Sequence, residues 1–438
     1  MTRLLSLVLI ALALAAPARA GLEIREVTSP GGITAWLQEE SSIPFIALEI
    51  RFKGGTSLDL PGKRGATYMM AGLLEEGAGD LDAEAFLKAR EELAASFSFD
   101  AHGDAVTVSA RFLSENRDQA VELLRKALVE PRFDDAAVER VRAQVISIIA
   151  GDQKDPREVA AETFDRLAYG DHPYGTPSTG TADSVNLLSR DDIVAAHKAA
   201  LARDRVYVAA VGDITAEELG RLLDDLLGGL PEKGAPMPPR AELQLTGGVT
   251  VVDMPTPQSV AVFGHRGIRR DDPDFFAAYV MNQIFGASGF TSRLSEEVRE
   301  KRGLTYGVYT YLATYDLAEL YLGSVASANN RIKDALDVIR AEWKRMAEGG
   351  ATAEELEAAK KYLTGAYPLR FDGNARIASI LVAMQLDGLP ADYIETRNDR
   401  INAVTLEDVA RVARRLLRPE DLRIVVVGRP LGVEPTEE

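Results

Sequence analysis

The sequence predicts an α+β protein made of two homologous domains, each a mostly antiparallel sheet with helices packed on one face. Three observations predict this fold class. The chain has 438 residues, more than the ~100 to 200 residues of an ordinary domain. Its second half repeats a pattern found in its first half. Short strand-like segments also lie between long helical segments, without the regular strand–helix–strand order of a doubly wound parallel sheet.

The internal repeat is the strongest evidence for two homologous domains. Residues 185–212 (VNLLSRDDIVAAHKAALARDRVYVAAVG) align without a gap on residues 401–428 (INAVTLEDVARVARRLLRPEDLRIVVVG), at an offset of 216 residues. In each copy Ser189 or Thr405 precedes an acidic first turn, which is the pattern of a helix N-cap, and a strand ending in glycine follows the helix. We therefore expect two copies of one structural unit.

The first 20 residues have the three parts of a secretory signal peptide. Arg3 precedes an apolar run, residues 4–16, and Ala18-Arg19-Ala20 forms a small-residue cleavage motif. The apolar run is shorter than the ~20 residues of a membrane span, and no later stretch is long and apolar enough to be one. A buried amino-terminal helix would explain the cleavage motif less well. We expect an exported protein, and the bacterial character of the signal predicts the periplasm.

The sequence after the signal peptide divides into two domains joined by a linker. Residues 230–247 are rich in proline and glycine, the composition of a linker. They separate a first domain, residues 21–229, from a second, residues 248–438. Period-2 alternation predicts strands over 47–52 and 105–112, and helical periodicity predicts helices over 83–94, 134–150 and 353–364.

Composition excludes several classes of function. The chain has no cysteine, so it can have neither a thiolate zinc site nor a cysteine nucleophile. Its formal charge is −17, and it becomes −19 when the two arginines of the signal peptide are removed. Such a charge argues against nucleic acid or an anionic membrane as a partner.

A glycine-rich segment followed by a helix carries the first family resemblance. Residues 54–57 read GGTS, and residues 65–77 read GATYMMAGLLEEG. This stretch resembles the zinc-binding region of the pitrilysin/insulinase family, whose active members have H-x-x-E-H on the helix after the glycine. Two histidines four residues apart lie on one helix face and reach one zinc, while the glutamate polarises its water. The resemblance implies the fold of pitrilysin and the mitochondrial processing peptidase.

The zinc-binding groups themselves are missing at the matching positions. The two histidine positions fall on Tyr68 and Gly72, and the glutamate position falls on Ala71. Ile148 follows Gly72 by 76 residues, the separation at which the family has its third ligand. None of these side chains is a useful zinc ligand at neutral pH. We therefore expect no catalytic residue and no metal in this chain.

The remaining candidate groups offer no obvious replacement. The four histidines, at positions 102, 172, 197 and 265, are too far apart in sequence to form a helical ligand pair. We expect His172 to belong to a turn and His102 and His197 to be surface residues. Glu75 and Glu76 are neighbours, which predicts a solvated helix end rather than an acid and base pair. A zinc site assembled from distant residues is a further alternative that sequence spacing does not test.

The second half carries the strongest positive signal. Residues 289–309, GFTSRLSEEVREKRGLTYGVY, look like the carboxy-terminal signature of the family, in which an arginine and a tyrosine seven residues later bind substrate. They are Arg299 and Tyr306 here, and Arg302 is an alternative to Arg299. Guanidinium and phenol groups donate hydrogen bonds suited to a peptide carbonyl or an oxyanion. Without the signature, they would be read as a surface charge and one strand aromatic among several.

The combination resembles the non-catalytic subunit of the two-chain members of the family. In those members one chain has H-x-x-E-H and the other keeps only the arginine and tyrosine. The resemblance implies a zinc-bearing partner chain, a peptide substrate, no nucleic acid and no membrane span, with zinc in the partner alone. Two alternatives remain: a structural or peptide-binding scaffold with no part in hydrolysis, and a hydrolase with an unrecognised site.

Overall fold

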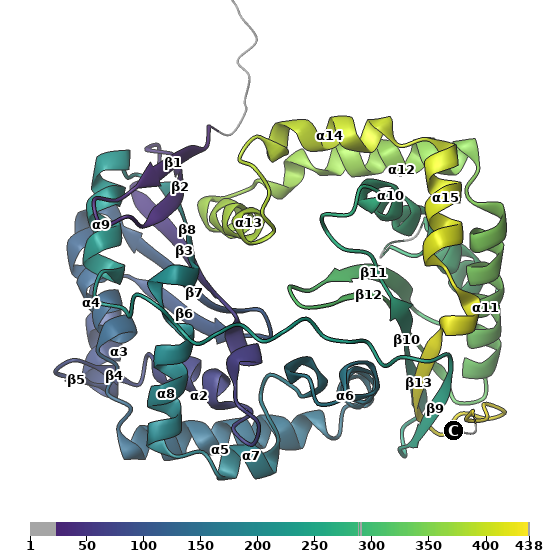
Figure 1. Cartoon of the computed structure of the whole chain (residues 1–438), viewed down its shortest axis with the longest axis horizontal. Coiled ribbons are helices and arrows are strands. Elements are labelled where there is room, and N and C mark those ends of the chain that lie inside the picture. Colours follow the sequence, from purple (N-terminus) through teal and green to yellow (C-terminus); the bar gives the residue numbers. More distant parts are fainter. Residues whose placement is uncertain (1–22, 288, 290, 437–438) are drawn as a thin grey trace, which may run out of the picture.

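We describe the fold from a computed structural model, which describes residues 23–287, 289 and 291–436. The signal peptide predicted for residues 1–20 lies outside this range. Figure 1 shows two halves that face each other, with an extended segment crossing between them. None of the helices described within residues 23–436 combines the length and apolarity needed to cross a bilayer.

The first half is built on a six-stranded sheet with strand order β1-β2-β8-β3-β7-β6. Its strands are β1 (Arg25–Thr28), β2 (Thr34–Glu39), β3 (Phe45–Lys53), β6 (Ser96–Ala101), β7 (Ala105–Leu113) and β8 (Val206–Gly212). All neighbours are antiparallel except β2 and β8, which are parallel. A short pair, β4 (Gly77–Ala78) and β5 (Leu81–Asp82), lies outside this sheet.

Helices from the same half cover one face of this sheet. They are α2 (Ala66–Leu73), α3 (Ala83–Glu92), α4 (Arg117–Val129), α5 (Asp135–Asp152), α7 (Ala182–Asn186), α8 (Arg190–Ala200) and α9 (Ala216–Leu227). In β3, the alternate residues Ile46, Leu48, Ile50 and Phe52 point into this core and are at most 1% exposed. The strands predicted over 47–52 and 105–112 are β3 and β7, and the helices predicted over 83–94 and 134–150 are α3 and α5.

The second half has a five-stranded sheet with strand order β11-β12-β10-β13-β9. The strands are β9 (Gly248–Asp253), β10 (Gln258–Arg266), β11 (Val308–Thr314), β12 (Glu319–Ala328) and β13 (Arg423–Gly428). Only β13 and β9 are parallel. The helices are α10 (Phe275–Phe285), α11 (Ile332–Gly349), α12 (Ala353–Ala366), α13 (Asn374–Leu386), α14 (Tyr393–Ala403) and α15 (Leu406–Leu416).

The repeat predicted from sequence has the same structure in both halves. Ser189 and Thr405 each cap a helix, α8 and α15, in a capping box with an aspartate three residues on. The strand that follows each helix, β8 or β13, takes one parallel and one antiparallel neighbour. The predicted α+β fold with two similar, mostly antiparallel domains is confirmed.

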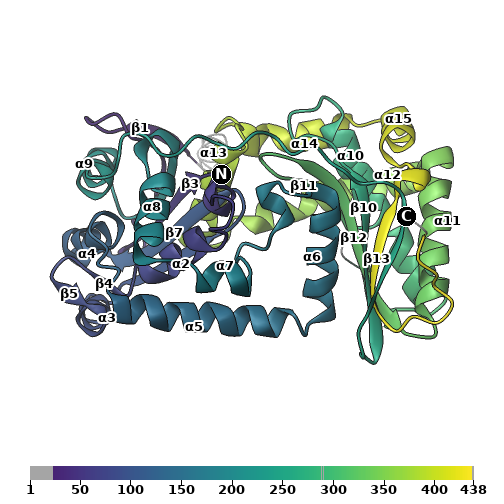
Figure 2. The same cartoon turned by 60° about the horizontal axis from the view of Figure 1, so that its bottom comes forward.

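One feature was not predicted: a helix from each half packs against the sheet of the other half. The helix α6 (Pro156–Tyr169) belongs to the first half but packs on β10 and β13, where Ala160, Phe164 and Ala168 meet Val260 and Val427. Reciprocally, α13 packs on the open face of β3 and β8. Figures 1 and 2 show α6 beside the second sheet, and Figure 1 shows α13 beside the first. The two halves are therefore interlocked, and the space between them is lined by both.

Candidate functional site

The frame of the family zinc helix is intact in α2. Gly65 precedes the helix in the left-handed conformation, with φ of 92°, where a side chain would be strained. The buried carboxylate of Asp59 accepts hydrogen bonds from the backbone N–H of Gly65 at 2.9 Å and from the N–H and hydroxyl of Thr67 at 3.0 and 2.6 Å. Burial nevertheless raises the pKa of Asp59. The start of α2 is therefore fixed by three hydrogen bonds to Asp59.

The four positions expected to lack zinc ligands lie where the resemblance places them, on α2 and α5. Ala71 is 2% exposed and Ile148 is 42% exposed, while Gly72 lies at the surface and Tyr68 is half-buried. Burial, together with the charges of Asp100 and Asp152, raises the pKa of the Tyr68 phenol. Tyr68 therefore stays protonated and is a poor metal ligand. Among the residues that the structure describes, no group of three histidine or acidic side chains could hold a metal ion.

The histidines take part in local structure. His172 caps a short 3-10 turn, Pro173–Gly175, and its Nδ1 accepts from the N–H of Tyr174 at 3.2 Å, as a turn residue should. His102 is exposed. The expectation that His197 lies at the surface is wrong: it is 8% exposed, and its Nε2 lies 2.8 Å from the carbonyl of Leu128. Position 197 lies on the inner stripe of α8, which the sequence pattern did not separate from the outer one.

Glu75 and Glu76 do not form an acid and base pair. Glu75 is bound by Arg90 at 2.7 Å, and Glu76 is bound by Arg140. The two glutamates thus have different partners on different elements, which agrees with the predicted solvated helix end.

The segment that carries the predicted substrate-binding pair forms a π-helical turn, Ser295–Glu300, and the loop before β11. Arg299 lies in the turn with its Nε 3.6 Å from Glu300 Oε1. Tyr306 lies in the loop and is 89% exposed. The Thr305 hydroxyl fixes that loop: it donates to the carbonyls of Gly307 and Ala326 and accepts from the N–H of Gly307. Tyr306 is thus presented to solvent by a well-anchored loop.

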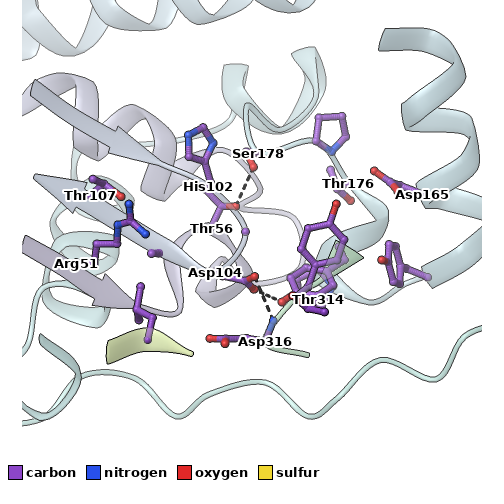
Figure 3. A pocket seen from close by; sticks show the side chains of 18 of the residues that line it. Arg51, Thr56, His102, Asp104, Thr107, Asp165, Thr176, Ser178, Thr314 and Asp316 are labelled. Atoms are coloured by element: carbon purple, nitrogen blue, oxygen red, sulfur yellow. Dashed lines mark hydrogen bonds between the residues drawn. The ribbon is translucent and has the colours of Figure 1, made fainter. Parts of the chain in front are cut away.

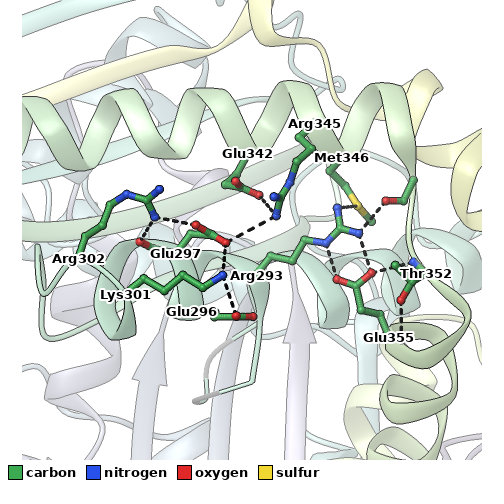
Figure 4. A network of polar contacts seen from close by, with 11 residues as sticks. Arg293, Glu296, Glu297, Lys301, Arg302, Glu342, Arg345, Met346, Thr352 and Glu355 are labelled. Carbon is green, nitrogen blue, oxygen red and sulfur yellow. Dashed lines mark hydrogen bonds and ion pairs between the residues drawn. The ribbon is translucent and has the colours of Figure 1, made fainter.

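Arg302, the alternative to Arg299, is engaged elsewhere. Its Nη1 donates to the side chain and backbone carbonyl of Glu297, at 2.6 and 2.7 Å. Lys301 and Arg345 also contact Glu297, as Figure 4 shows. Hydrogen bonds from Lys301 and Arg302 lower the pKa of this buried glutamate to about 2. The network anchors the π-helical turn and occupies Arg302, so Arg299 remains the candidate for substrate.

Two adjoining pockets lie between the halves. The first, which we call the tyrosine pocket, has a volume of about 490 Å³ and is lined by residues that include Tyr306, Tyr309, Tyr311, Tyr315 and Asp165. The second, the acidic pocket, has a volume of about 480 Å³, and its lining includes Asp104, Asp165, Asp316, Asp387, Tyr169 and Tyr315. Asp165 and Tyr315 line both. The structure therefore brings Tyr306 to the rim of a chamber that leads to a set of carboxylates, whereas Arg299 lines neither pocket.

Sequence reasoning missed most of this chamber. Tyr309 and Tyr311 point to the same side of β11 because strand side chains alternate, and their rings stack at 6.2 Å. That spacing could have marked a tyrosine-lined face. Asp165 had no sequence signal, because α6 joins the chamber only through the helix exchange.

Comparison with known proteins places the chain in a family. Residues 35–182 match the model described as "Insulinase (Peptidase family M16)", and residues 187–363 match "Peptidase M16 inactive domain". The chain belongs to the M16 peptidase family. The pitrilysin/insulinase resemblance seen in the sequence is thus confirmed.

Several relatives of this M16 chain are similar over nearly their whole length. The non-peptidase homolog YmxG of Helicobacter pylori is 26% identical over 393 residues, which cover 89% of this chain and 90% of the relative. An uncharacterized zinc protease of Streptomyces coelicolor is 26% identical over 401 residues, covering 90% of this chain and 87% of that one. A crystal structure of a peptidase M16 inactive domain from Pseudomonas fluorescens has a TM-score of 0.88 and 28% identity, covering 95% and 100% of the two chains.

These matches agree with the side chains found on α2. Residues 187–363 and the Pseudomonas fluorescens structure are matched under the description of an M16 inactive domain, and the Helicobacter pylori relative is described as a non-peptidase homolog. The protein is an inactive member of the M16 family.

Proposed function

We propose that this M16 chain is the non-catalytic, substrate-binding subunit of an exported heteromeric zinc peptidase that degrades or processes peptides in the periplasm. A second pitrilysin-like chain with H-x-x-E-H supplies the zinc, which polarises a water for attack on the peptide carbonyl. This chain contributes the opposite wall of the chamber and no metal. The observation that carries the proposal is a loss confined to the zinc positions, Tyr68, Ala71, Gly72 and Ile148, beside an intact Arg299 and Tyr306 signature.

The exposure of Tyr306 supports a role at an interface or on a ligand. A phenol that is 89% exposed contributes little to the core, yet its loop is fixed by three hydrogen bonds of Thr305. A fixed loop lowers the entropy cost of placing a donor on a substrate. Tyr306 and Arg299 would then donate hydrogen bonds to the substrate backbone, and to the oxygen that becomes negative on attack.

The alternative is a structural or peptide-binding scaffold that takes no part in hydrolysis. A scaffold of this kind would also keep α2 folded and metal-free. It gives no reason to keep Arg299 and Tyr306 in the signature, so a change at Tyr306 separates the two functions.

The test measures cleavage of a quenched peptide by this chain alone, by a zinc-bearing partner alone and by the mixture. We expect only the mixture to cleave. Tyr306→Phe in the mixture should lower the rate on the order of hundredfold to thousandfold, the range for removing one oxyanion donor. Tyr362→Phe, an exposed tyrosine on α12, is the matched control and should leave the rate unchanged.

Two results would overturn this function. Chelator-sensitive cleavage by the chain alone would mean that an active metal site exists. A mixture that cleaves equally well with Tyr306→Phe would favour the scaffold.

A further inference from the structure

The second half contains a buried arginine without an acidic partner. Arg423 begins β13 and is 8% exposed. Its Nη2 donates to the Thr250 hydroxyl at 2.5 Å, and its buried Nε has no hydrogen-bond partner among the described residues. No carboxylate within the described part of the chain forms an ion pair with it. Removing a cation from water without a counter-ion is costly, so the surroundings of Arg423 are incomplete.

The fold itself does not require a charge at this position. The internal repeat pairs Arg423 with Tyr207, at the same offset of 216 residues, and Tyr207 lies in the equivalent strand β8. Arg51 of the acidic pocket, by contrast, has an acidic partner, because its Nη2 lies 3.6 Å from Glu49 Oε1. Figure 3 shows Arg51 on the wall of that pocket. The buried guanidinium without a carboxylate is therefore a feature of the second half alone.

Arg423 lines a small pocket of about 240 Å³, which we call the linker pocket because residues 244–247 of the linker form part of it. Alternation along β13 puts Arg423 on the same face as Val425 and Val427, which pack against α6. Helix α6 and the tail after β13 complete the walls. The linker pocket shares no lining residue with the tyrosine pocket or the acidic pocket. It is therefore a separate site.

Two further hydrogen-bond donors line the linker pocket beside Arg423. The hydroxyl oxygen of Thr436 accepts from the N–H of Val249 at 2.9 Å, which leaves its O–H available to donate. Gln244 is fixed to α6, since its backbone N–H donates to the carbonyl of Ala168 at 2.9 Å. Its side-chain amide has no hydrogen-bond partner among the described residues. A buried guanidinium with unused donors around it indicates a missing acceptor.

The lining also indicates which anion the linker pocket would take. Its described residues include one cation and no acid, so the charge matches a singly charged anion. A guanidinium binds a carboxylate through two parallel hydrogen bonds. Leu167 and Leu245 supply apolar surface on the same walls, which suits a short hydrocarbon tail. A volume of about 240 Å³ is below that of an ordinary drug-sized site and admits a small acid.

We infer that the linker pocket is a binding site for a carboxylate with a short apolar tail, held by Arg423, with Thr436 and Gln244 as further donors. A bound carboxylate would join α6, the linker, β13 and the tail, because all four line the pocket. This chemistry has two sources. One is a free small acid, and the other is the side chain of Glu437 or Glu438, which follow Thr436 in the sequence and lie outside the described residues.

The experiment measures binding of butyrate to this chain alone, by calorimetry, so that it depends neither on a partner nor on the proposed function. Butyramide is the neutral probe of nearly the same shape. We expect a dissociation constant on the order of 1 mM for butyrate. Butyramide should bind about tenfold or more weakly, because it lacks the charge that the guanidinium pairs with.

A chain that ends at Thr436 separates the two sources of the carboxylate. Butyrate binding by both the full chain and the shortened chain indicates a free acid as the ligand. Binding by the shortened chain alone indicates that a glutamate of the chain itself fills the linker pocket.

Variants of Arg423 test whether the guanidinium holds the ligand. Arg423→Met should raise the dissociation constant of butyrate about tenfold or more. Arg423→Lys should raise it by a smaller factor, because an ammonium keeps the charge but cannot form the bidentate pair. Arg429→Met is the matched control, since Arg429 is exposed and pairs with Asp253 outside the pocket, and it should leave butyrate binding unchanged.

A variant of the linker tests the same site without changing Arg423, in case the Arg423 variants do not fold. Thr246 is an exposed residue that lines the linker pocket. Thr246→Glu places a carboxylate there, which should compete with butyrate, whereas Thr246→Gln should not. The site is overturned by equal binding of butyrate and butyramide, or by no butyrate binding in either chain. It is also overturned if Arg423→Met or Thr246→Glu binds butyrate as well as the wild type.

Discussion

The surroundings of Asp165 change the pKa of its carboxyl group. Burial raises the pKa of its carboxyl to about 7, and repulsion from Glu162 adds to the shift. In the unfolded chain the same carboxyl titrates near 3.9. The folded protein therefore holds a proton on Asp165 over a range of pH in which the unfolded chain has lost it.

The raised pKa makes the free energy of unfolding fall as the pH rises toward 7. A carboxyl whose pKa is raised on folding contributes most below its unfolded pKa, and that contribution is lost as the pH rises through about 7. We expect Asp165→Asn to be more stable than the wild type above pH 7, by a few kcal/mol at most, because the amide cannot ionise. The difference should shrink as the pH falls toward 4.

The measurement is urea unfolding of both proteins at several pH values between about 4 and 8. The other titratable and charged groups near Asp165 are the same in both proteins. Those that line the acidic pocket are Arg51, His102, Asp104, Tyr169, Tyr174, Tyr315, Asp316 and Asp387, and Glu162 and Tyr311 interact electrostatically with Asp165 from outside it. A difference between the two proteins that does not change with pH would mean that Asp165 is ionised throughout. It would also mean that the carboxylate has a partner that the structure does not show.

At the scale of the element, helix α2 has the capped start expected of the family's zinc-binding helix but lacks the zinc-ligand side chains. Asp59 accepts from the N–H of Gly65 before the helix, Gly65 is left-handed, and α2 packs against α5. A Cβ added at Gly72 would lie 3.6 Å from Val141 Cγ1, which is an ordinary contact. A side chain can therefore begin at position 72 without a clash at its Cβ.

This geometry predicts that zinc binding can be restored. We expect Tyr68→His, Gly72→His and Ile148→Glu together to bind zinc in a one-to-one ratio after dialysis, because two imidazoles and a carboxylate form a three-ligand site. The buried Ala71 is left unchanged, so hydrolysis is not expected. Metal content is the measurement, and the matched triple variant Tyr68→Phe, Gly72→Ala and Ile148→Gln should bind none. A restored variant that stays metal-free would show that α2 and α5 are not in the register of an active site.

Some helices could be predicted from the sequence and others could not. Helix periodicity and caps placed α3, α5, α8, α12 and α15, because local patterns decide where such helices begin. The helix exchange escaped prediction because α6 has an ordinary apolar stripe, Ala160, Phe164 and Ala168, which any sheet could cover. For the same reason the sequence did not predict that Asp165 and Tyr169 line the chamber. Their place there depends on which sheet α6 packs against. Tyr68, Ala71, Gly72 and Ile148 were placed because the motif has a fixed spacing.

At the scale of the whole molecule, α6 and α13 bind the two halves into one unit. Phe164 is 1% exposed in the core that α6 forms with the second sheet. The extended segment between the halves also rests on α6, because the N–H of Gln244 donates to the carbonyl of Ala168 at 2.9 Å. Figure 1 shows this segment crossing from one half to the other. Helix α6 thus lines the chamber and also holds one residue of the linker.

Phe164→Ala should therefore loosen the linker as well as weaken the fold. Removing a buried phenylalanine costs about 3–5 kcal/mol, and here the lost contacts join the two halves. Phe86→Ala is the matched control, since Phe86 is also 1% exposed but lies in the core of the first half alone. Under native conditions, we expect limited proteolysis to cut residues 231–246 faster in Phe164→Ala than in Phe86→Ala, although urea unfolding shows similar losses of stability. Equal cleavage rates would mean that the linker is held independently of α6, and that the chamber walls do not depend on the exchanged helix.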